Sequence, residues 1–96
     1  MNYTLILLPD VAHTISSLPA PLKQQVRAAL DEIKSDPHTG KPLRDDLWGF
    51  WTYRVRRFRI IYRIRHQRIE IEVVAVGSRK NIYERVSSFV RNLPRE

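Results

Sequence analysis

Residues 53–65 have the sequence Tyr-Arg-Val-Arg-Arg-Phe-Arg-Ile-Ile-Tyr-Arg-Ile-Arg, in which apolar residues alternate with arginines on both sides of a reversal near Arg57. A period of two predicts two β-strands, at about residues 50–56 and 58–65, each buried on one face only. The other face carries almost nothing but arginine. Like charges on neighbouring strands repel each other, so we expect this face to bind an anion. The turn residues Arg56-Arg57 include no glycine, asparagine or proline and leave the register open.

The segments around this hairpin predict an α+β fold. An apolar run at residues 3–8 predicts a first strand buried on both faces. Helical spacing follows at 11–18, with Asp10 as the expected cap, and at 20–35, so that two antiparallel helices form a hairpin. Residues 68–76 predict a further strand, and 79–93 a last helix. The order gives one domain over residues 1–96, with the helical hairpin packed on a small, twisted, antiparallel-rich sheet and followed by a C-terminal helix.

The segment between the helical hairpin and the arginine strands predicts a loop that returns to the core. Residues 38–42, His-Thr-Gly-Lys-Pro, are loop by composition. Leu43, Leu47 and Trp48 are expected to hold the following segment against the core, and Gly49 marks a turn. The remaining large aromatic residues of the strands are assigned to the core or its rim: Trp51, Tyr53 and Tyr62.

The charge of the chain is concentrated in one region. The formal net charge is +7 and the isoelectric point is about 10.4. Residues 54–80 hold nine basic and two acidic residues, so this region alone accounts for +7. A concentrated basic region favours a polyanionic partner such as nucleic acid, or an acidic protein segment. The alternative is a generally basic, soluble surface.

The composition also excludes several classes of site. The chain has no cysteine, which excludes disulfides, a thiolate nucleophile and cysteine metal sites. No pair of its three histidines has metal-ligand spacing, so we expect neither a metal nor a cofactor. The apolar run near the start is too short for a signal peptide or a membrane span, and a cytoplasmic protein without membrane contact is expected.

Several fragments together resemble the RelE/ParE superfamily of bacterial and archaeal type II toxins. They are Asp-Pro at 36–37, Gly-Lys-Pro-Leu at 40–43, Leu-Trp-Gly-Phe-Trp-Thr-Tyr-Arg-Val at 47–55, Phe-Arg-Ile-Ile-Tyr at 58–62 and Val-Gly-Ser-Arg at 76–79, with Tyr83 four residues on. The resemblance covers almost the whole chain. It implies a compact RelE/ParE-like domain paired with an antitoxin. The RelE branch implies a ribonuclease that cuts messenger RNA in the ribosomal A site, and the ParE branch implies a poison of DNA gyrase.

The resemblance also implies a set of catalytic residues. The family's basic positions correspond to Arg54 and Arg56, the arginine before the Ile-Ile-Tyr strand to Arg59, and the one after the glycine to Arg79. The helix tyrosine corresponds to Tyr83. Arginine suits metal-independent RNA cleavage because its planar fork grips phosphate oxygens and stays charged. Tyr83 would stack on a base or transfer a proton.

Each of these residues also has a purely structural interpretation. Arg54 would brace the hairpin through a carboxylate, Arg59 would pair with Glu72 across the sheet, and Tyr83 would be a partly buried helix residue. Arg54 and Arg56 stand where some RelE-like nucleases have lysines, and Ser78 stands where others have a histidine.

The general base is therefore the open question of the predicted site. Arginine is a poor general base at neutral pH because its pKa lies above about 12. Glu72 would serve if its side chain reached the arginine cluster, although a salt-bridge role fits it better. His13, His38 and His66 are expected at the surface or at caps.

Three functions compete at this stage. The first is a ribosome-dependent mRNA endonuclease toxin. The second, favoured by the missing lysines and histidine, is a ParE-type gyrase poison without nuclease activity. The third is a non-toxic member that only binds a partner. In each case we expect an antitoxin whose acidic amphipathic segment covers the helices and the sheet, giving a hetero-oligomer.

Overall fold

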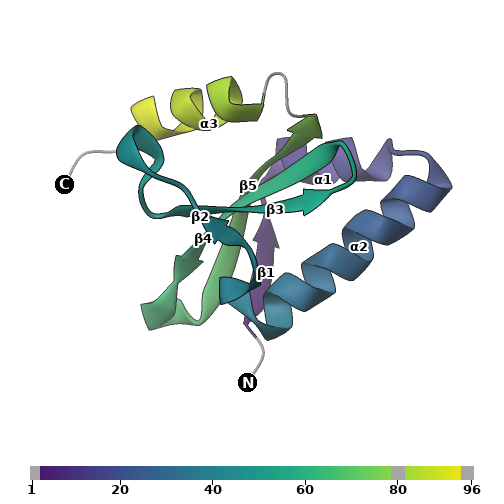
Figure 1. Ribbon diagram of the computed structural model, residues 1–96, viewed down its shortest axis with the longest axis horizontal. Coiled ribbons are helices and arrows are strands. Elements are labelled where there is room, and N and C mark those ends of the chain that lie inside the picture. Colours follow the sequence, from purple (N-terminus) through teal and green to yellow (C-terminus); the bar gives the residue numbers. More distant parts are fainter. Residues whose placement is uncertain (1–2, 79–81, 94–96) are drawn as a thin grey trace.

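The computed structural model describes residues 3–78 and 82–93 and has the predicted α+β architecture (Figure 1). The described elements, in chain order, are strand β1 (Thr4–Leu7), helix α1 (Pro9–Ser16), helix α2 (Ala20–Ser35), strands β2 (Lys41–Pro42), β3 (Phe50–Val55), β4 (Phe58–Arg65) and β5 (Glu70–Ser78), and helix α3 (Ile82–Arg91). Short 3₁₀ turns at Pro37–Thr39, Asp45–Leu47 and His66–Arg68 connect them.

The five strands form one mixed sheet in the order β1-β5-β4-β3-β2. β1 runs parallel to β5, and all other neighbouring strands are antiparallel. This confirms the antiparallel-rich sheet. Lys41 and Pro42, predicted as loop, pair with Thr52 and Trp51 as the short edge strand β2. Composition could not indicate this strand, because its backbone hydrogen-bond partners belong to β3, which is distant from it in the local sequence pattern.

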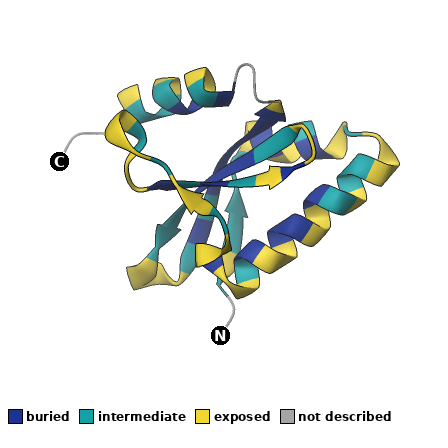
Figure 2. Ribbon diagram, in the orientation of Figure 1, coloured by how far each residue is buried: buried dark blue, intermediate teal, exposed yellow. Residues whose placement is uncertain are grey.

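Both faces of the sheet are covered, which corrects the prediction of burial on one face (Figure 2). Helices α1 and α2 cover one face, where Ile60, Tyr62 and Val73 are buried. Helix α3 covers the other face, where Phe50 and Ile61 are buried. The alternation of apolar residues with arginines predicted one exposed face, because α3 packs over only part of that face. Apolar residues lie under the helix, and arginines lie on the part of the face that it leaves open.

A β-bulge in β5 determines which residues face α3. Ile61 pairs with Ala75 and Tyr62 pairs with Val73, so Val74 has no partner on β4. Val74 and Ala75 both join the cluster beneath α3. The extra residue changes the alternation of β5, and Gly77 therefore comes opposite Arg59.

Two details of the N-terminal half differ from expectation. Helix α1 begins at Pro9 after Leu8, and Asp10 lies in its first turn instead of capping it. A carboxylate there still favours the helix, because it faces the positive end of the helix dipole. Strand β1 lies at the sheet edge and its residues are half-buried at most. Helix α2 matches its prediction and buries Val26, Ala29, Leu30 and Ile33.

The segment before β3 also differs in one residue. Leu43 and Leu47 pack against the cluster under α3, as predicted, and Gly49 turns the chain with a φ of 97°. Trp48, assigned to the core or its rim, is 81% exposed. The 3₁₀ turn that ends at Leu47 directs the leucine inward and leaves the next side chain in solvent. No helix in the described ranges has the length and apolar character to cross a membrane.

Tyr62 and Gly40 join the sheet to the segment that follows α2. Tyr62 is fully buried, and its hydroxyl donates a hydrogen bond to the carbonyl of Pro37 at 2.6 Å. Gly40 lies so close that a Cβ there would be 2.6 Å from both the Tyr62 hydroxyl and the Thr52 carbonyl. The requirement for glycine is one of space, since φ of Gly40 is −79°.

Gly40→Ala is expected to lower the free energy of unfolding by about 1–3 kcal/mol, because the backbone of Thr52 cannot move without disturbing the sheet. Urea denaturation followed by circular dichroism measures this. Gly77→Ala is the matched control, since the nearest atoms to its added Cβ are side-chain atoms of Arg85 and Ile82 at 3.4 Å. Equal losses for the two variants would contradict the close-contact explanation.

The buried Tyr62 hydroxyl also predicts a loss of stability at high pH. Burial raises the pKa of Tyr62 to about 12 from 10.0. Between these two values the unfolded chain has released the proton and the folded chain keeps it. The contribution is therefore complete below pH 10 and is lost as the pH rises toward 12. Urea midpoints across this window should fall less for Tyr62→Phe than for the natural chain; parallel curves would contradict the assignment.

Candidate functional site

Arg54 and Arg59 lie directly opposite each other at the open end of the α3-covered face. Arg54 on β3 pairs with Arg59 on β4, and Arg59 pairs with Gly77 on β5. Side chains at directly opposite positions have Cβ atoms about 4.5–5.5 Å apart. The two guanidinium groups therefore belong to one row across the sheet, which we call the arginine row (Arg54, Arg59 and position 77).

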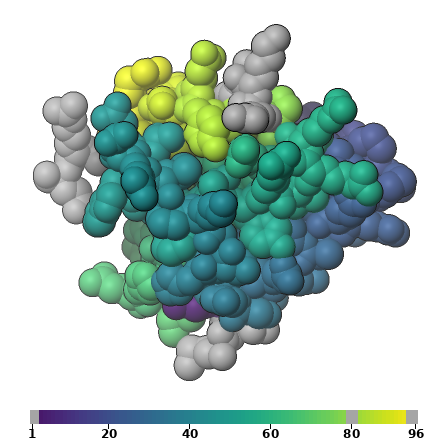
Figure 3. All heavy atoms as spheres, viewed as in Figure 1, coloured from purple at the N-terminus to yellow at the C-terminus, as the bar shows by residue number. Residues whose placement is uncertain are grey.

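The row lies near the beginning of α3. A Cβ at Gly77 would be 3.4 Å from Cδ1 of Ile82, the first residue of that helix. The first N–H groups of a helix create a positive potential, which adds to that of the arginines. In Figure 3 the teal-green side chains of the β3–β4 hairpin lie between the yellow-green helix α3 and the blue helix α2, open to solvent.

Arg54 braces the hairpin, but not through a carboxylate. Its Nε donates to the carbonyl of Arg56 at 3.0 Å, across the turn. The side chain is exposed, and this bond uses one of the five N–H donors of the guanidinium. Arg54 is thus held in place at one end and can bind an anion at the other.

Arg56 is separated from the row. It occupies the left-handed conformation, with a φ of 55°, in the two-residue turn between Val55 and Phe58. Its Nε donates a hydrogen bond to Oε1 of Gln25 at 3.0 Å. Gln25 belongs to α2, which lies on the opposite side of the sheet from α3. A hollow of about 450 Å³ lies beside this bond, lined by Pro19, Pro21, Leu22, Gln25, Arg56, Arg57 and Phe58.

Glu72 pairs with Arg63 and not with Arg59 or Arg54. Nε of Arg63 lies 2.5 Å from Oε1 of Glu72, its direct cross-strand neighbour, and the Arg63 guanidinium stacks 5.5 Å from the ring centre of Phe89. Arg59 faces Gly77, five residues along β5 from Glu72. The pairing of β4 with β5 therefore separates Glu72 from the row and excludes the predicted Arg59–Glu72 pair.

The histidines lie away from the arginine row. His13 is on α1, where it lines a hollow between α1 and α3. His38 and His66 stack on each other with ring centres 6.1 Å apart, beside Trp51 and Tyr3. Their exposure agrees with the prediction of surface positions. In residues 3–78 and 82–93, no carboxylate or imidazole forms a hydrogen bond or ion pair with Arg54 or Arg59.

The catalytic roles of all five predicted site residues, Arg54, Arg56, Arg59, Arg79 and Tyr83, remain predictions. Tyr83 lies on α3, half-buried against the cluster that contains Ile61 and Val86. Arg79 lies outside the described residues.

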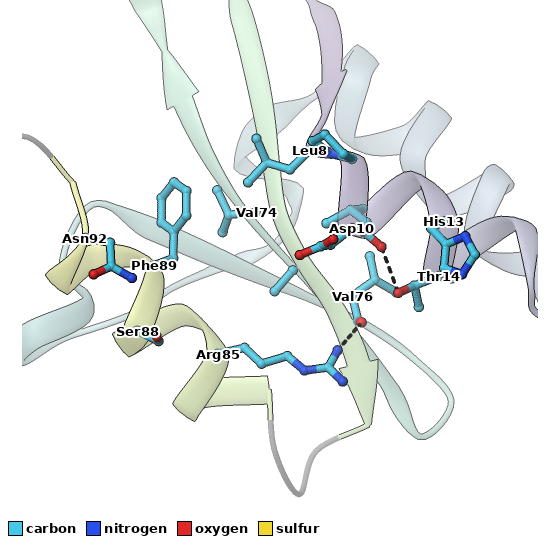
Figure 4. A pocket seen from close by; sticks show the side chains of 13 residues that line it. Leu8, Asp10, His13, Thr14, Val74, Val76, Arg85, Ser88, Phe89 and Asn92 are labelled. Carbon is cyan, nitrogen blue, oxygen red and sulfur yellow. Dashed lines mark hydrogen bonds between the residues drawn. The ribbon is translucent and has the colours of Figure 1, made fainter.

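One basic residue was missed by the sequence reasoning. Arg85 of α3 reaches back to β5, where its Nη1 lies 3.4 Å from the carbonyl of Val76. It also borders the hollow of about 710 Å³ between α1 and α3 (Figure 4). In the sequence Arg85 is one basic residue among others on an amphipathic helix, and only the packing of α3 on β5 distinguishes it.

The fold and the site thus define a small, basic α+β domain with an arginine row at the open end of a mixed sheet. The profile of the family described as the ParE toxin of type II toxin–antitoxin systems, parDE, matches residues 9–83. The chain is 30% identical to Toxin RelG of Mycobacterium tuberculosis over 87 residues, which are 88% of this chain and all of that toxin. The chain therefore belongs to the ParE toxin family of type II toxin–antitoxin systems, within the RelE/ParE superfamily.

Solved structures support the same fold. The toxin–antitoxin complex RelBE2 of Mycobacterium tuberculosis contains a chain with a TM-score of 0.74 and 26% identity, covering 82% of this chain and all of that one. A double arginine-to-alanine variant of the E. coli toxin RelE in the free state gives a TM-score of 0.77 at 20% identity, covering 97% of this chain and all of that one. The archaeal RelE–RelB complex of Pyrococcus horikoshii gives 0.68 at 18% identity, covering 83% and 98%.

The Arg56–Gln25 bond predicts a coupled effect on stability. Arg56→Ala and Gln25→Ala should each lower the free energy of unfolding by about 0.5–1.5 kcal/mol, and the double variant should lose little more than one of them, because both remove the same bond. Urea denaturation of the four proteins measures the coupling. Arg57→Ala, its neighbour in the turn, is the control. Strict additivity would show that the bond contributes nothing.

Proposed function

We propose that this toxin is a ribosome-dependent, metal-independent endonuclease that cuts messenger RNA and so inhibits translation. The observation that carries the proposal is the arginine row, in which Arg54 and Arg59 face each other on adjacent strands with no acidic partner among the described residues. Two uncompensated guanidinium groups repel each other, and an anion between them removes that cost. The phosphate of RNA has the charge and the oxygen geometry that the arginine fork binds.

The reaction that fits this arrangement is attack of a ribose 2′-hydroxyl on the adjacent phosphate. Negative charge accumulates on the phosphate oxygens in the transition state, and fixed guanidinium groups stabilise it there more than in the ground state. Arg54 is held by its bond to the Arg56 carbonyl, and Arg59 is half-buried, so both are partly preorganised. Arg79 and Tyr83 complete the site in this proposal, with Tyr83 stacking on a base or transferring a proton.

In this proposal Arg56 has a different role from the other arginines. Through its bond to Gln25, Arg56 would hold the hairpin tip against α2. The Arg56 carbonyl would then support Arg54, which donates a hydrogen bond to it. With no carboxylate or imidazole bonded to Arg54 or Arg59 among the described residues, most of the rate enhancement would come from orientation and charge stabilisation.

A DNA gyrase poison is the alternative function. The match of residues 9–83 to the ParE toxin family favours it, as does the finding that, among the described residues, no carboxylate or imidazole is bonded to Arg54 or Arg59. A supercoiling assay with purified gyrase separates the two functions. Inhibition of supercoiling at toxic doses, with cellular mRNA left intact, would replace the nuclease proposal by this one.

We also propose an antitoxin as the protein partner. The RelBE2 and the archaeal RelE–RelB structures are both toxin–antitoxin complexes. An acidic amphipathic segment would suit this chain, since it would neutralise the basic face while its apolar side packs against the helices and the sheet.

Arg59→Ala is expected to lower mRNA cleavage by about 100-fold or more, because the row loses the charge that stabilises the transition state. Purified toxin is added to a translating extract, and new mRNA 5′ ends are mapped and counted over time. Arg27→Ala removes an equal charge from the exposed face of α2 and serves as the control. Cleavage by Arg59→Ala at the rate of the control, or no cleavage by the natural chain, would refute the nuclease proposal.

A further inference from the structure

We infer that Arg85 is a further phosphate-binding residue and supplies the third guanidinium of the arginine row. The inference rests on the proposed function, because it assigns a new contact to the RNA backbone at the same site. Arg85 is not among the candidate site residues that were predicted from the sequence.

The first argument is the place of Arg85 in the row. Arg54, Arg59 and Gly77 are successive cross-strand neighbours on β3, β4 and β5. Gly77 has no side chain to contribute, and Nη1 of Arg85 lies 3.4 Å from the position that its Cβ would occupy. The guanidinium of Arg85, arriving from α3, therefore fills the place of the side chain that β5 lacks.

The second argument is that the guanidinium has capacity left to bind a ligand. The group has five N–H donors. In the described part of the chain its one hydrogen bond is to the Val76 carbonyl at 3.4 Å, which is long for such a bond. The ion pair found among the described residues joins Arg63 to Glu72 and does not involve Arg85. A single long hydrogen bond of this kind orients the side chain without satisfying its charge.

The third argument is accessibility. Arg85 is an exposed residue and borders the hollow between α1 and α3, so a ligand can reach its guanidinium from solvent (Figure 4). The carboxylate of Asp10 borders the same hollow on the α1 side and would repel a phosphate there. The balance of charge thus places the phosphate at the Arg85 end, beside Arg59, and leaves the α1 side to an uncharged part of the nucleotide.

Binding of a short, fluorescein-labelled single-stranded RNA, measured by anisotropy over a range of salt, tests this without depending on cleavage. Arg85→Gln keeps a donor for the Val76 carbonyl and removes the charge. It should weaken binding several-fold and reduce the slope of log K against log salt by about 0.7, the value for one phosphate contact on a single strand. Arg85→Lys should restore the salt slope and part of the affinity.

Arg27→Ala on α2 is the matched loss of one exposed charge, and thermal unfolding of each variant checks that the fold is retained. One outcome would overturn the role of Arg85 alone. In it, Arg85→Gln binds RNA as well as Arg27→Ala does, while Arg59→Ala binds weakly. If Arg59→Ala also binds like the control, the arginine row does not contact RNA and the proposed function fails with it. Weak binding by Arg59→Ala and Arg85→Gln, with the natural slope retained by Arg27→Ala, is the expected result.

Discussion

The pairing of β3 with β4 through a turn of two residues is the constraint on which the other features of the site depend. Once Val55 pairs with Phe58, Arg54 must face Arg59, and Tyr62 must enter the core beneath α2. The turn requires a positive φ at Arg56, which a non-glycine residue adopts at some cost. The bonds from Arg54 to the Arg56 carbonyl and from Arg56 to Gln25 hold this conformation, so the local cost is offset by contacts that also fix the hairpin tip.

The bulge in β5 has a comparable effect on the other side of β4. It brings Gly77 opposite Arg59, and it places Glu72 beside Arg63. Arg63 lies four residues along β4 from Arg59, so Glu72 is distant from the arginine row, and Gly77 leaves a gap that Arg85 can fill from α3. Without the bulge, the residues of β5 on one side of it would turn to the opposite face of the sheet, whereas the Arg54–Arg59 pair on β3 and β4 would remain.

The arrangement joins function to stability in a simple way. Helix α3 buries apolar residues over part of its sheet face and begins beside Gly77, at the end where the arginines lie. Repulsion within the row is tolerated because the groups are partly exposed and the core beneath them is formed by Ile60, Tyr62 and Val73 on the opposite face. In the proposed function, the positive charge of the row can therefore persist until an anionic ligand binds.

The sequence by itself determined the α+β class, the helices α1 and α2, the antiparallel hairpin and the concentration of charge. These follow from periodicity and composition, which are properties of neighbouring residues. It did not determine the burial of both sheet faces, strand β2, the partner of Glu72, the separation of Arg56 from the row or the position of Arg85. Each of those depends on how segments far apart in the chain meet: α2 against the hairpin tip, α3 across Gly77, and β5 against β4 with one residue unpaired. Periodicity and composition contain no information on these long-range contacts, and only the tertiary structure decides them.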